Sequence, residues 1–509
     1  MMFRFAVALV AGLLQAASIA APWNGEPQWW LQLLSLAALA WTVQQAPSWK
    51  QAGLLGWLFG TAWLCGTFWW LYISMHVYGG LPSVLAAVAV LALAAFLSTY
   101  YAAACAVFRM LDWPGGVFRG LLFAALWTFA ELARVTWFTG FPWGAGGYAH
   151  VDGPLSVLAP WVGVHGIGLA AALLAFALSL LGRRDTLRSW RYWLAMVGAA
   201  GLLAACNMAS VPPQSATTHP RLPVALLQGN IPQDEKFEGG TGIPIALEWY
   251  GRQMQASTAA LVVLPETAIP VLPQQLPAGY FDAMRQRFAT GAQAALVGIP
   301  LGSFDEGYTN SVIGLKPGAQ LYRFDKHHLV PFGEFIPPLF KWFTRMMNIP
   351  LGDFNRGPIG QPAFEWQGQR LAPNICYEDL FGEELAAGFA NPASAPTIFV
   401  NVSNIAWFGN SVAIDQHLHI SRMRTLEFER PMIRATNTGA TVIIDHRGRV
   451  THSLPRHTRG VLTGEVEGRS TITPYAWWVS RLGLWPFWLA ALAVVAATAW
   501  RRKKAVTAV

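Results

Sequence analysis

The chain has 509 residues, of which 54% are hydrophobic and only 12% are charged. The charged share is about half that of an average soluble domain, and the mean hydropathy is +0.36. This composition excludes a disordered, collagen-like or small disulfide-stapled chain and argues against an ordinary soluble enzyme. It predicts a membrane protein that also carries a soluble part.

Positive charge is concentrated in the two apolar parts of the chain. The formal net charge of +8 divides into +4 for residues 1–220, −2 for residues 221–468 and +6 for residues 469–509. Lysine and arginine beside apolar runs are typical of membrane orientation. Binding of nucleic acid, which a pI of about 9.4 would otherwise suggest, is therefore not expected.

Eight apolar runs approach the roughly 20 residues that a helix needs to cross a membrane. They lie at approximately 5–21, 28–44, 52–73, 82–106, 117–137, 157–181, 190–209 and 482–500. The first run ends in small residues and is also compatible with a cleaved signal peptide, although an uncleaved helix is favoured beside so many closely spaced runs.

Basic residues fall in alternate loops between these runs, as the positive-inside rule requires. With the N-terminus inside, the cytoplasmic side receives Lys50, Arg109, Arg119, Arg183, Arg184, Arg188, Arg191, Arg501, Arg502, Lys503 and Lys504. Residues 210–481 are then predicted outside, on the periplasmic or extracellular face.

The pattern changes after residue 210, where a linker rich in Pro, Ser and Thr precedes short apolar runs. Predicted strands lie at 223–230, 260–266, 294–300, 310–315, 371–378, 396–404 and 440–448, and predicted helices lie at 244–258, 278–290 and 412–430. Such alternation indicates an α/β domain. We therefore expect a bundle of seven helices over 1–211, a soluble domain over 221–468 and a last membrane helix over 482–500.

Three of the four cysteines fall in apolar runs, and only Cys376 lies in the predicted soluble domain. It has no disulfide partner there, and a lone thiol in an oxidising compartment is expected to be buried or used. The sequence has neither a Cys-x-x-Cys pair nor a His-x-x-x-His spacing, so we expect no metal and no cofactor.

Three segments of this domain carry candidate catalytic groups. Glu266 follows an apolar run in LVVLPETAIP, Lys326 lies in YRFDKHHLVPFGEFIP, and Cys376 ends another apolar run in NICYEDLFGEE. A thiol with its ordinary pKa of about 8.5 needs a base to remove its proton. A carboxylate supplies that base, and an ammonium stabilises the oxyanion of an acyl-transfer intermediate. Together these groups predict acyl transfer through a thioester.

Each of the three residues has an ordinary explanation when it is taken alone. A glutamate at a strand end is usually solvated, a lysine in a charged run usually lies on the surface, and a single cysteine is usually a buried structural thiol. Only their joint occurrence in three ordered motifs favours catalysis.

The ordered motifs resemble the nitrilase, or carbon–nitrogen hydrolase, superfamily over residues 224–468, which implies an α-β-β-α sandwich. Further matches are GFPW at 140–143, QGNIPQ at 228–233 and NVSNIAWFGNS at 401–411. With seven apolar runs before the domain and one after it, the whole chain resembles the apolipoprotein N-acyltransferase family of the bacterial inner membrane.

The resemblance implies that Glu266 is the general base, Lys326 the stabiliser of the oxyanion and Cys376 the nucleophile. Supporting positions are Glu334, Tyr377 and Glu378. Phe237 stands where some relatives have tryptophan. Expected substrate contacts, made in part by an apolar arm over 335–350, are Phe237, Trp342, Phe343 and Trp407.

The implied reaction moves an acyl chain from a membrane phospholipid to Cys376, and then to the α-amino group of the S-diacylglyceryl cysteine of an apolipoprotein. We expect a monomer whose catalytic domain faces the periplasm and whose C-terminus is cytoplasmic. The main alternative is a membrane-tethered amidase that lets water resolve the thioester. A transporter is disfavoured because the runs carry few ionisable residues, and a receptor would leave the three motifs unexplained.

Overall fold

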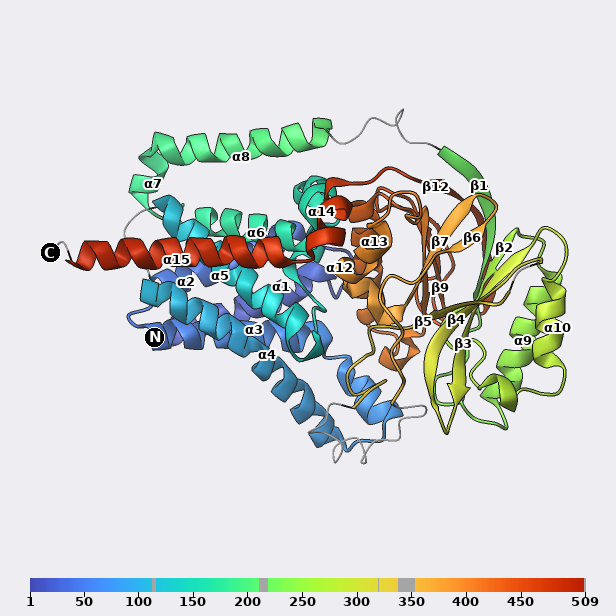
Figure 1. Cartoon of the computed structure of the whole chain (residues 1–509). Helices are drawn as coiled ribbons and strands as arrows, with labels where there is room; N and C mark the ends of the chain where they lie inside the picture. Colours follow the sequence, from blue (N-terminus) through green and yellow to red (C-terminus); the bar gives the residue numbers. More distant parts are fainter. Residues whose placement is uncertain (112–115, 210–217, 319, 337–352, 508–509) are drawn as a thin grey trace. The chain divides into compact units, whose positions relative to one another are not determined.

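The computed structural model describes residues 1–111, 116–209, 218–318, 320–336 and 353–507. The chain divides into two compact units (Figure 1). The helical unit comprises Met1–Trp69, Val84–Pro213 and Leu482–Val509, and the sandwich unit comprises Trp70–Ser83 and Gln214–Arg481.

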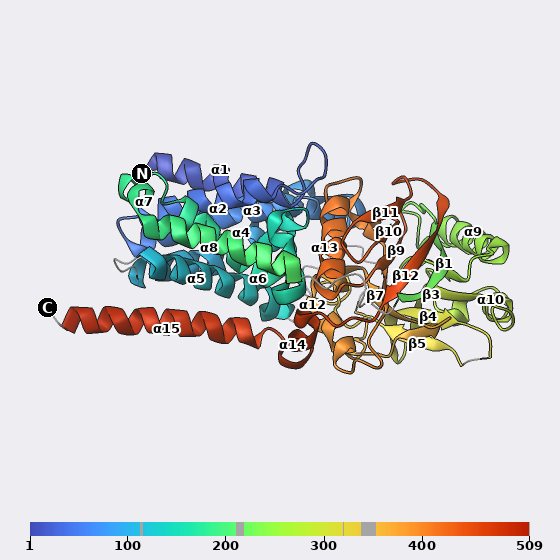
Figure 2. The same ribbon diagram turned by 90° about the horizontal axis from the view of Figure 1, so that it is seen from above.

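The helical unit is built from long apolar helices, which Figure 2 shows from above. Its helices are α1 (Met2–Ile19), α2 (Trp29–Gln44), α3 (Trp49–Phe68), α4 (Ser83–Leu111), α5 (Gly116–Thr136), α6 (Ala159–Leu178), α7 (Arg184–Arg188), α8 (Trp190–Ala209) and α15 (Trp485–Thr507). Each of the eight predicted apolar runs therefore coincides with a described helix.

Five helical stretches of the described residues are long and apolar enough to cross a membrane. They are Met2–Ile19, Ser83–Leu111, Phe118–Thr139, Pro154–Leu178 and Trp190–Ala209. A sixth is added if α14 (Pro474–Leu482) and the following helix, which are bent by 83° at a short break, form one span. The helices α2 and α3 are not among these stretches, so the count of eight spans stays a prediction.

Small residues bring the helices of this unit close together. A Cβ added at Gly12 of α1 would lie 2.3 Å from the carbonyl oxygen of Phe59 in α3. A Cβ at Gly56 of α3 would lie 2.7 Å from the carbonyl oxygen of Tyr101 in α4. Such close backbone approach is typical of helix packing in membranes, where van der Waals contact replaces the hydrophobic effect.

The sandwich unit contains two sheets of described strands. The first has the order β12-β1-β2-β3-β4-β5 and the second has the order β11-β10-β9-β8-β7-β6. The strands are β1 (Thr218–Gln228), β2 (Leu261–Val263), β3 (Ala294–Ser303), β4 (Gly307–Leu315), β5 (Tyr322–Asp325), β6 (Phe364–Trp366), β7 (Gln369–Ile375), β8 (Ile398–Ser403), β9 (Met432–Thr436), β10 (Val442–Ile444), β11 (Val450–Ser453) and β12 (Gly460–Arg469). Strands β1, β2 and β3 pair in parallel, as do β7, β8 and β9.

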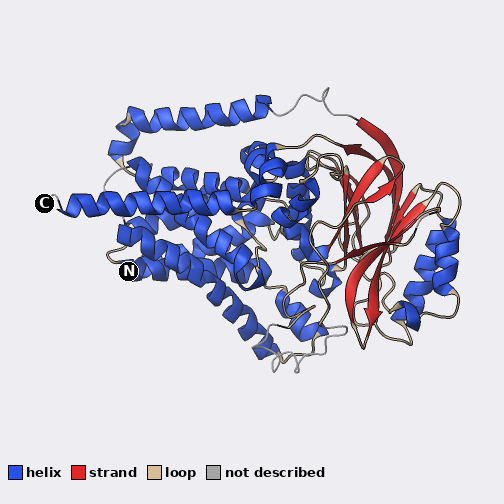
Figure 3. Cartoon of the chain, viewed as in Figure 1, coloured by secondary structure: helices blue, strands red, loops and turns tan. Residues whose placement is uncertain are grey.

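Helices cover the outer faces of both sheets, as Figure 3 shows. Apolar residues of β1, β2 and β3 pack on α9 (Gly242–Ala256) and α10 (Tyr280–Arg287). The second sheet is covered by α13 (Ala413–Phe428) and the short α12 (Gly382–Leu385). Between the sheets lies a core of Val, Leu and Ile from both of them, including Leu226, Val263, Val400 and Ile433. The predicted α-β-β-α sandwich is confirmed.

All seven predicted strands and all three predicted helices of this unit are present. The sequence did not predict β5, β6, β9, β11 and β12. These strands lack a long apolar run, since β6 has three residues and every residue of β11 is exposed. Such strands are defined by pairing with a neighbour rather than by their own composition.

One segment between α3 and α4 belongs to the sandwich unit. Trp70 is buried, its indole N–H donates to Gln416 Oε1 at 3.0 Å, and its ring lies 4.1 Å from that of Phe408. A short helical turn, Ile73–Tyr78, follows it. The sandwich unit is therefore assembled from two separate parts of the chain.

Candidate active site

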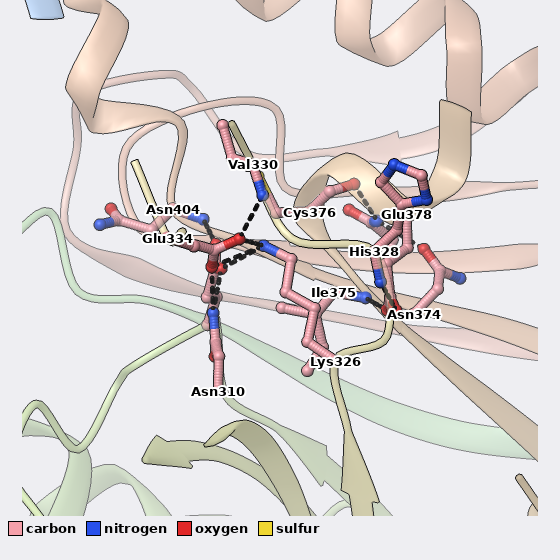
Figure 4. Close-up of polar contacts among 12 residues, drawn as sticks. Asn310, Lys326, His328, Val330, Glu334, Asn374, Ile375, Cys376, Glu378 and Asn404 are labelled. Atoms are coloured by element: carbon pink, nitrogen blue, oxygen red, sulfur yellow. Dashed lines mark hydrogen bonds and ion pairs between the residues drawn. The ribbon is translucent and has the colours of Figure 1, made fainter. Parts of the chain in front are cut away.

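Glu266, Lys326 and Cys376 come from different strand ends and meet at one place. Glu266 follows β2 in the first sheet, Lys326 follows β5 at the edge of that sheet, and Cys376 follows β7 in the second sheet. Figure 4 shows the Lys326 ammonium pointing toward the carboxylate of Glu334. Side chains at the carboxyl ends of strands converge in this way because the core between the sheets holds those ends together.

A buried ammonium lies between two carboxylates. Lys326 Nζ is 3.2 Å from Glu266 Oε1 and 2.8 Å from the carboxylate of Glu334. The amide of Asn310 donates to Glu266 Oε1 at 2.7 Å and to Glu334 Oε1 at 2.8 Å. The backbone N–H of Asn404 donates to Glu266 Oε2 at 2.8 Å. Both oxygens of Glu266 are therefore fixed in position.

These contacts set the charge of the two groups. Burial favours the neutral acid of Glu266, but Lys326, the Asn310 amide and the Asn404 N–H outweigh it, so the pKa of Glu266 is lowered. Burial alone would also lower the pKa of Lys326, but the charges of Glu266 and Glu334 raise it above its ordinary value. The site therefore holds an ionised carboxylate beside a protonated lysine.

The nucleophile candidate lies in a strained backbone conformation. Cys376 has φ = +52°, a left-handed value that residues other than glycine rarely adopt. Its carbonyl oxygen is 3.1 Å from His417 Nε2 and accepts from the Asn401 amide at 3.4 Å. The conformation turns the chain from β7 into the 3₁₀ helix Cys376–Leu380. Strain of this kind persists where surrounding contacts hold it, and it is common at functional sites.

The Cys376 thiol is protonated in this state. Burial and the charge of Glu266 raise its pKa to about 12, and the charge of Lys326 opposes this only in part. A preformed thiolate is therefore disfavoured. The ionised Glu266 must take the proton when the sulfur attacks, which is the task of a general base.

A buried polar network holds the backbone behind the nucleophile. His417 Nε2 also lies 2.9 Å from Asp379 Oδ1, and Asp379 accepts from the hydroxyl of Ser421. On its other nitrogen, His417 Nδ1 lies 2.6 Å from an Arg434 guanidinium nitrogen. Burial, aided by Arg434, lowers the pKa of His417. The imidazole is then neutral, with Nε2–H donating and Nδ1 accepting.

The supporting residues predicted from sequence take distinct places. Glu334 binds Lys326, as described above, and also accepts from the N–H of Val330 at 2.8 Å. Glu378 accepts the N–H groups of Ile375 and His327 at 2.7 Å each. It thereby joins the end of β7 to the loop after Lys326, and burial raises its pKa to about 7.

The aromatic residues that were predicted at the site have fewer informative contacts. The Tyr377 ring is buried and packs 5.3 Å from that of Phe381. Phe237 is half-buried with the Lys236 ammonium 5.9 Å from its ring, and Trp407 is half-buried with its ring 6.0 Å from that of Tyr78. Trp342 and Phe343 lie outside the described residues. Substrate contact by Phe237, Trp342, Phe343 and Trp407 stays a prediction.

Sequence reasoning missed several groups that the fold brings to the site. Asn310 bridges two carboxylates from β4, and Lys236 donates to the backbone carbonyl of Glu266 at 3.1 Å. The polar residues of NSVIGL, in a strand that is otherwise buried and apolar, were the available signal for Asn310. Within the described residues, no group of three or more His, Cys, Asp or Glu is arranged to hold a metal ion.

Comparisons with known proteins cover both units. Residues 11–177 match the family model described as apolipoprotein N-acyltransferase N-terminal domain, and residues 223–475 match carbon-nitrogen hydrolase. A protein of Verminephrobacter eiseniae (strain EF01-2) named apolipoprotein N-acyltransferase is 61% identical over 498 residues, which cover 94% of this chain and 92% of that protein. The chain belongs to the apolipoprotein N-acyltransferase family. The resemblance inferred from the motifs is confirmed.

Other relatives agree with this assignment. A protein of the same name from Ralstonia nicotianae is 46% identical, with 94% of this chain and 90% of that protein covered. A carbon-nitrogen hydrolase from Helicobacter pylori G27 matches 53% of this chain and 94% of its own, at 15% identity and a TM-score of 0.35, which adds no argument. As a member of the apolipoprotein N-acyltransferase family, the chain is an acyltransferase and a multi-pass membrane protein.

Proposed function

We propose that this acyltransferase moves an acyl chain from a membrane phospholipid to the α-amino group of the S-diacylglyceryl cysteine of apolipoproteins. The proposal rests on one observation above the others. An ionised glutamate, a protonated lysine and a protonated thiol, drawn from three distant segments, meet in a buried site of a chain from the apolipoprotein N-acyltransferase family. These are the groups that thioester-mediated acyl transfer needs.

The first step forms the thioester. Glu266 accepts the proton of Cys376 while the sulfur attacks the carbonyl carbon of a phospholipid ester. The carbonyl oxygen becomes an oxyanion, which the ammonium of Lys326 and the backbone N–H of Tyr377 stabilise. When this intermediate collapses, the ester C–O bond breaks and Glu266 returns the proton to the glycerol oxygen. A lysophospholipid leaves, and the acyl chain stays on Cys376.

The second step forms the amide. The neutral α-amine of the acceptor attacks the thioester carbon, and Glu266 takes one proton from the nitrogen as the new bond forms. The same two donors stabilise the second oxyanion. The C–S bond then breaks, Glu266 gives its proton to the departing sulfur, and the free thiol of Cys376 is restored.

Glu334 and Asn310 hold Lys326 and Glu266 in position during both steps. Because Glu334 and Asn310 bind Lys326 and Glu266 at 2.7–2.8 Å, the ammonium stays in place when Glu266 becomes protonated. Lys326 then keeps one carboxylate partner throughout the cycle. A charge that needs no rearrangement during the reaction stabilises an oxyanion more effectively than one that must be moved.

We further propose that the enzyme lies in the bacterial inner membrane as a monomer, with eight spans and a cytoplasmic C-terminus. The bias of lysine and arginine supports this orientation. The catalytic domain, proposed over 221–468 between the membrane parts 1–211 and 482–500, then faces the periplasm. The donor is a membrane phospholipid and the acceptor a diacylglyceryl apolipoprotein.

The competing proposal is an amidase, in which water resolves the thioester. The identity of 61% to a named N-acyltransferase over nearly the whole chain favours transfer to an amine. So does the helical unit, because hydrolysis of a soluble amide has no need of a membrane anchor.

Intact mass spectrometry tests the proposal directly. Purified enzyme incubated with phospholipid should gain the mass of one acyl chain, and hydroxylamine should remove it. Cys376→Ala should show no gain, whereas Cys206→Ala, which removes a cysteine of the helical unit, should behave as wild type. Addition of a diacylglyceryl peptide should then transfer the acyl mass to the peptide. A folded wild-type enzyme that gains no mass from phospholipid would contradict the proposal, and loss of the adduct to water alone would favour the amidase.

A further inference from the structure

A second buried lysine lies beside the proposed general base. Lys236, in the turn after β1, is 2% exposed. Its ammonium donates to the backbone carbonyl of Glu266 at 3.1 Å and faces the ring of Phe237 at 5.9 Å. Among the described residues it makes no other hydrogen bond and has no carboxylate at ion-pair distance. An ammonium has three N–H donors, so two of them remain available.

Gln233, in the same turn, offers a second available donor. Its side chain is 5% exposed, and its Oε1 accepts from the amide of Asn404 at 2.9 Å. Its Nε2 is buried and has no hydrogen-bond partner among the described residues. Asn404 also holds Glu266 Oε2 through its backbone N–H, so Gln233 is linked to Glu266 through Asn404, whereas Lys236 contacts Glu266 directly. Buried donors without partners are rare in native proteins and call for an explanation.

The charge of Lys236 acts on the reacting groups. Burial lowers the pKa of Lys236 to about 7, and the charges of Glu266 and Cys376 oppose that shift. Glu266 and Glu334 are already paired with Lys326. A buried cation that has only a neutral carbonyl as partner is destabilised, and an entering anion would stabilise it.

We propose that Lys236 and Gln233 bind the phosphodiester of the acyl donor. This inference rests on the proposed function, in which a phospholipid supplies the acyl chain. The phosphodiester is an anion with oxygen acceptors for several N–H donors, and it sits on the same glycerol as the ester that Cys376 attacks. The ester carbonyl is neutral, and the diacylglyceryl acceptor carries no phosphate. The pair therefore serves the first half-reaction and selects phospholipids over uncharged diacylglycerols.

A positioning role is the alternative that the experiment must separate. Lys236 also anchors the backbone carbonyl of Glu266, and loss of that anchor would slow attack on every ester equally. Loss of a phosphate contact would slow only donors that carry a phosphate. The ratio of the acylation rates with a phospholipid and with a diacylglycerol of the same chains distinguishes the two roles.

The experiment uses the full-length enzyme in detergent micelles. Acylation of Cys376 is followed by intact mass with dipalmitoyl phosphatidylglycerol and with dipalmitoylglycerol, for wild type, Lys236→Met and Lys236→Arg. Lys316→Met is the matched control, because Lys316 also donates to a backbone carbonyl and faces a phenylalanine ring, but it is only half-buried and is distant in sequence from Lys236. Loss of a charged hydrogen bond should lower the rate ratio about tenfold or more in Lys236→Met. Lys236→Arg should keep most of the ratio, and Lys316→Met should keep all of it.

A second variant, Gln233→Glu, keeps the proposal testable if Lys236→Met fails to fold. Gln233→Glu keeps the oxygen that accepts from Asn404 but places a negative charge where the phosphate is proposed to bind. It should therefore lower the same ratio without loss of the Asn404 contact. Equal slowing with both lipids, or an unchanged ratio in both variants, would overturn the phosphodiester proposal in favour of positioning. Inhibition by millimolar inorganic phosphate that is equally strong with both lipids would assign the pair to free phosphate instead.

The same experiment gives a different result if the proposed function itself is wrong. If folded wild type forms no adduct with either lipid, the proposed phospholipid donor is wrong, and the inference falls with it. If wild type forms the adduct at similar rates with both lipids, the proposed function stands and only the phosphodiester site is rejected.

Discussion

Two buried ion pairs, one in each unit, use their charges differently. In the helical unit, Glu131 and Arg134 are three residues apart on α5, and Arg134 also donates to the carbonyl oxygens of Phe141 and Trp143. In the sandwich unit, Lys326 meets Glu266 and Glu334 from separate segments, with two carboxylates around one ammonium. Both sets are almost completely buried.

The difference separates a structural pair from a reactive one. The Arg134 guanidinium faces neutral backbone carbonyls and one carboxylate, and Tyr101 O–H donates to that carboxylate at 3.0 Å. These two charges therefore have a structural role, because they hold the GFPW loop at 140–143 against α5. Around Lys326 a second carboxylate, Glu334, shares the ammonium, so Lys326 keeps a charged partner when Glu266 accepts a proton. Such an arrangement suits a base that must gain and lose a proton in each cycle.

The largest effect is expected when the reactive pair loses its base. Glu266→Gln keeps the shape and a hydrogen-bonding side chain but removes the proton acceptor. The rate of thioester formation should fall by about 10²–10⁴-fold, the usual contribution of a general base. Intact mass over time, corrected for the folded fraction, measures this rate. A variant that retained a tenth of the wild-type rate would contradict the role of Glu266 as base.

The same substitution in the other pair should affect stability instead. Glu131→Gln leaves Arg134 without its carboxylate in a buried place, and removal of one partner of a buried pair costs about 3 kcal/mol. The temperature of unfolding in detergent should fall. The rate of acylation per folded molecule should stay close to that of wild type. A selective loss of rate with normal stability would show that Glu131 acts in the reaction.

A smaller effect is expected on the pH profile. Burial works to raise the pKa of Glu266, and the amide of Asn310 is one of the contacts that lower it. Asn310→Ala should therefore raise that pKa, because a hydrogen bond to the charged form is lost. Acylation needs ionised Glu266, so activity should be lost at a higher pH as the pH falls. The acidic limb of kcat/KM against pH should move to higher pH, by up to about one unit for one hydrogen bond.

The matched control for that profile is Asn355→Ala. Asn355 donates to the backbone carbonyl of Glu306 in an exposed loop, away from the two carboxylates. Its acidic limb should coincide with that of wild type. A shift of equal size in both variants would mean that the shift reports general destabilisation rather than the charge of Glu266.

The smallest effect is expected for an exposed pair. Arg252 and Glu248 form an ion pair on α9, and their side chains are 66% and 71% exposed. Arg252→Ala should change the free energy of unfolding by less than about 0.5 kcal/mol, because water and salt screen exposed pairs. Chemical denaturation measures this change. A change above about 1 kcal/mol would contradict the expectation that the effect of losing an ion pair increases with the burial of that pair.

Much of this arrangement was predictable because it is encoded locally. Apolar runs of helical length identify the helices, and short apolar runs identify strands such as β3 and β8, since both patterns reflect burial of neighbouring residues. The strands without such runs, including β11 and β12, were missed for the same reason. The helices were located correctly, whereas the number of spans depends on length and composition together and stays a prediction.

The active site also combines features that are encoded locally with features that depend on tertiary contacts. The sequence by itself determined the membrane class, the family and three motifs, because composition and short spacing survive without a structure. Only the tertiary structure decided that Asn310 bridges Glu266 and Glu334, that Lys236 is buried beside them, and that Cys376 adopts a left-handed backbone. These features depend on how two sheets stack and on which strand ends they bring together. Contacts between residues far apart in the chain leave no local pattern in the sequence.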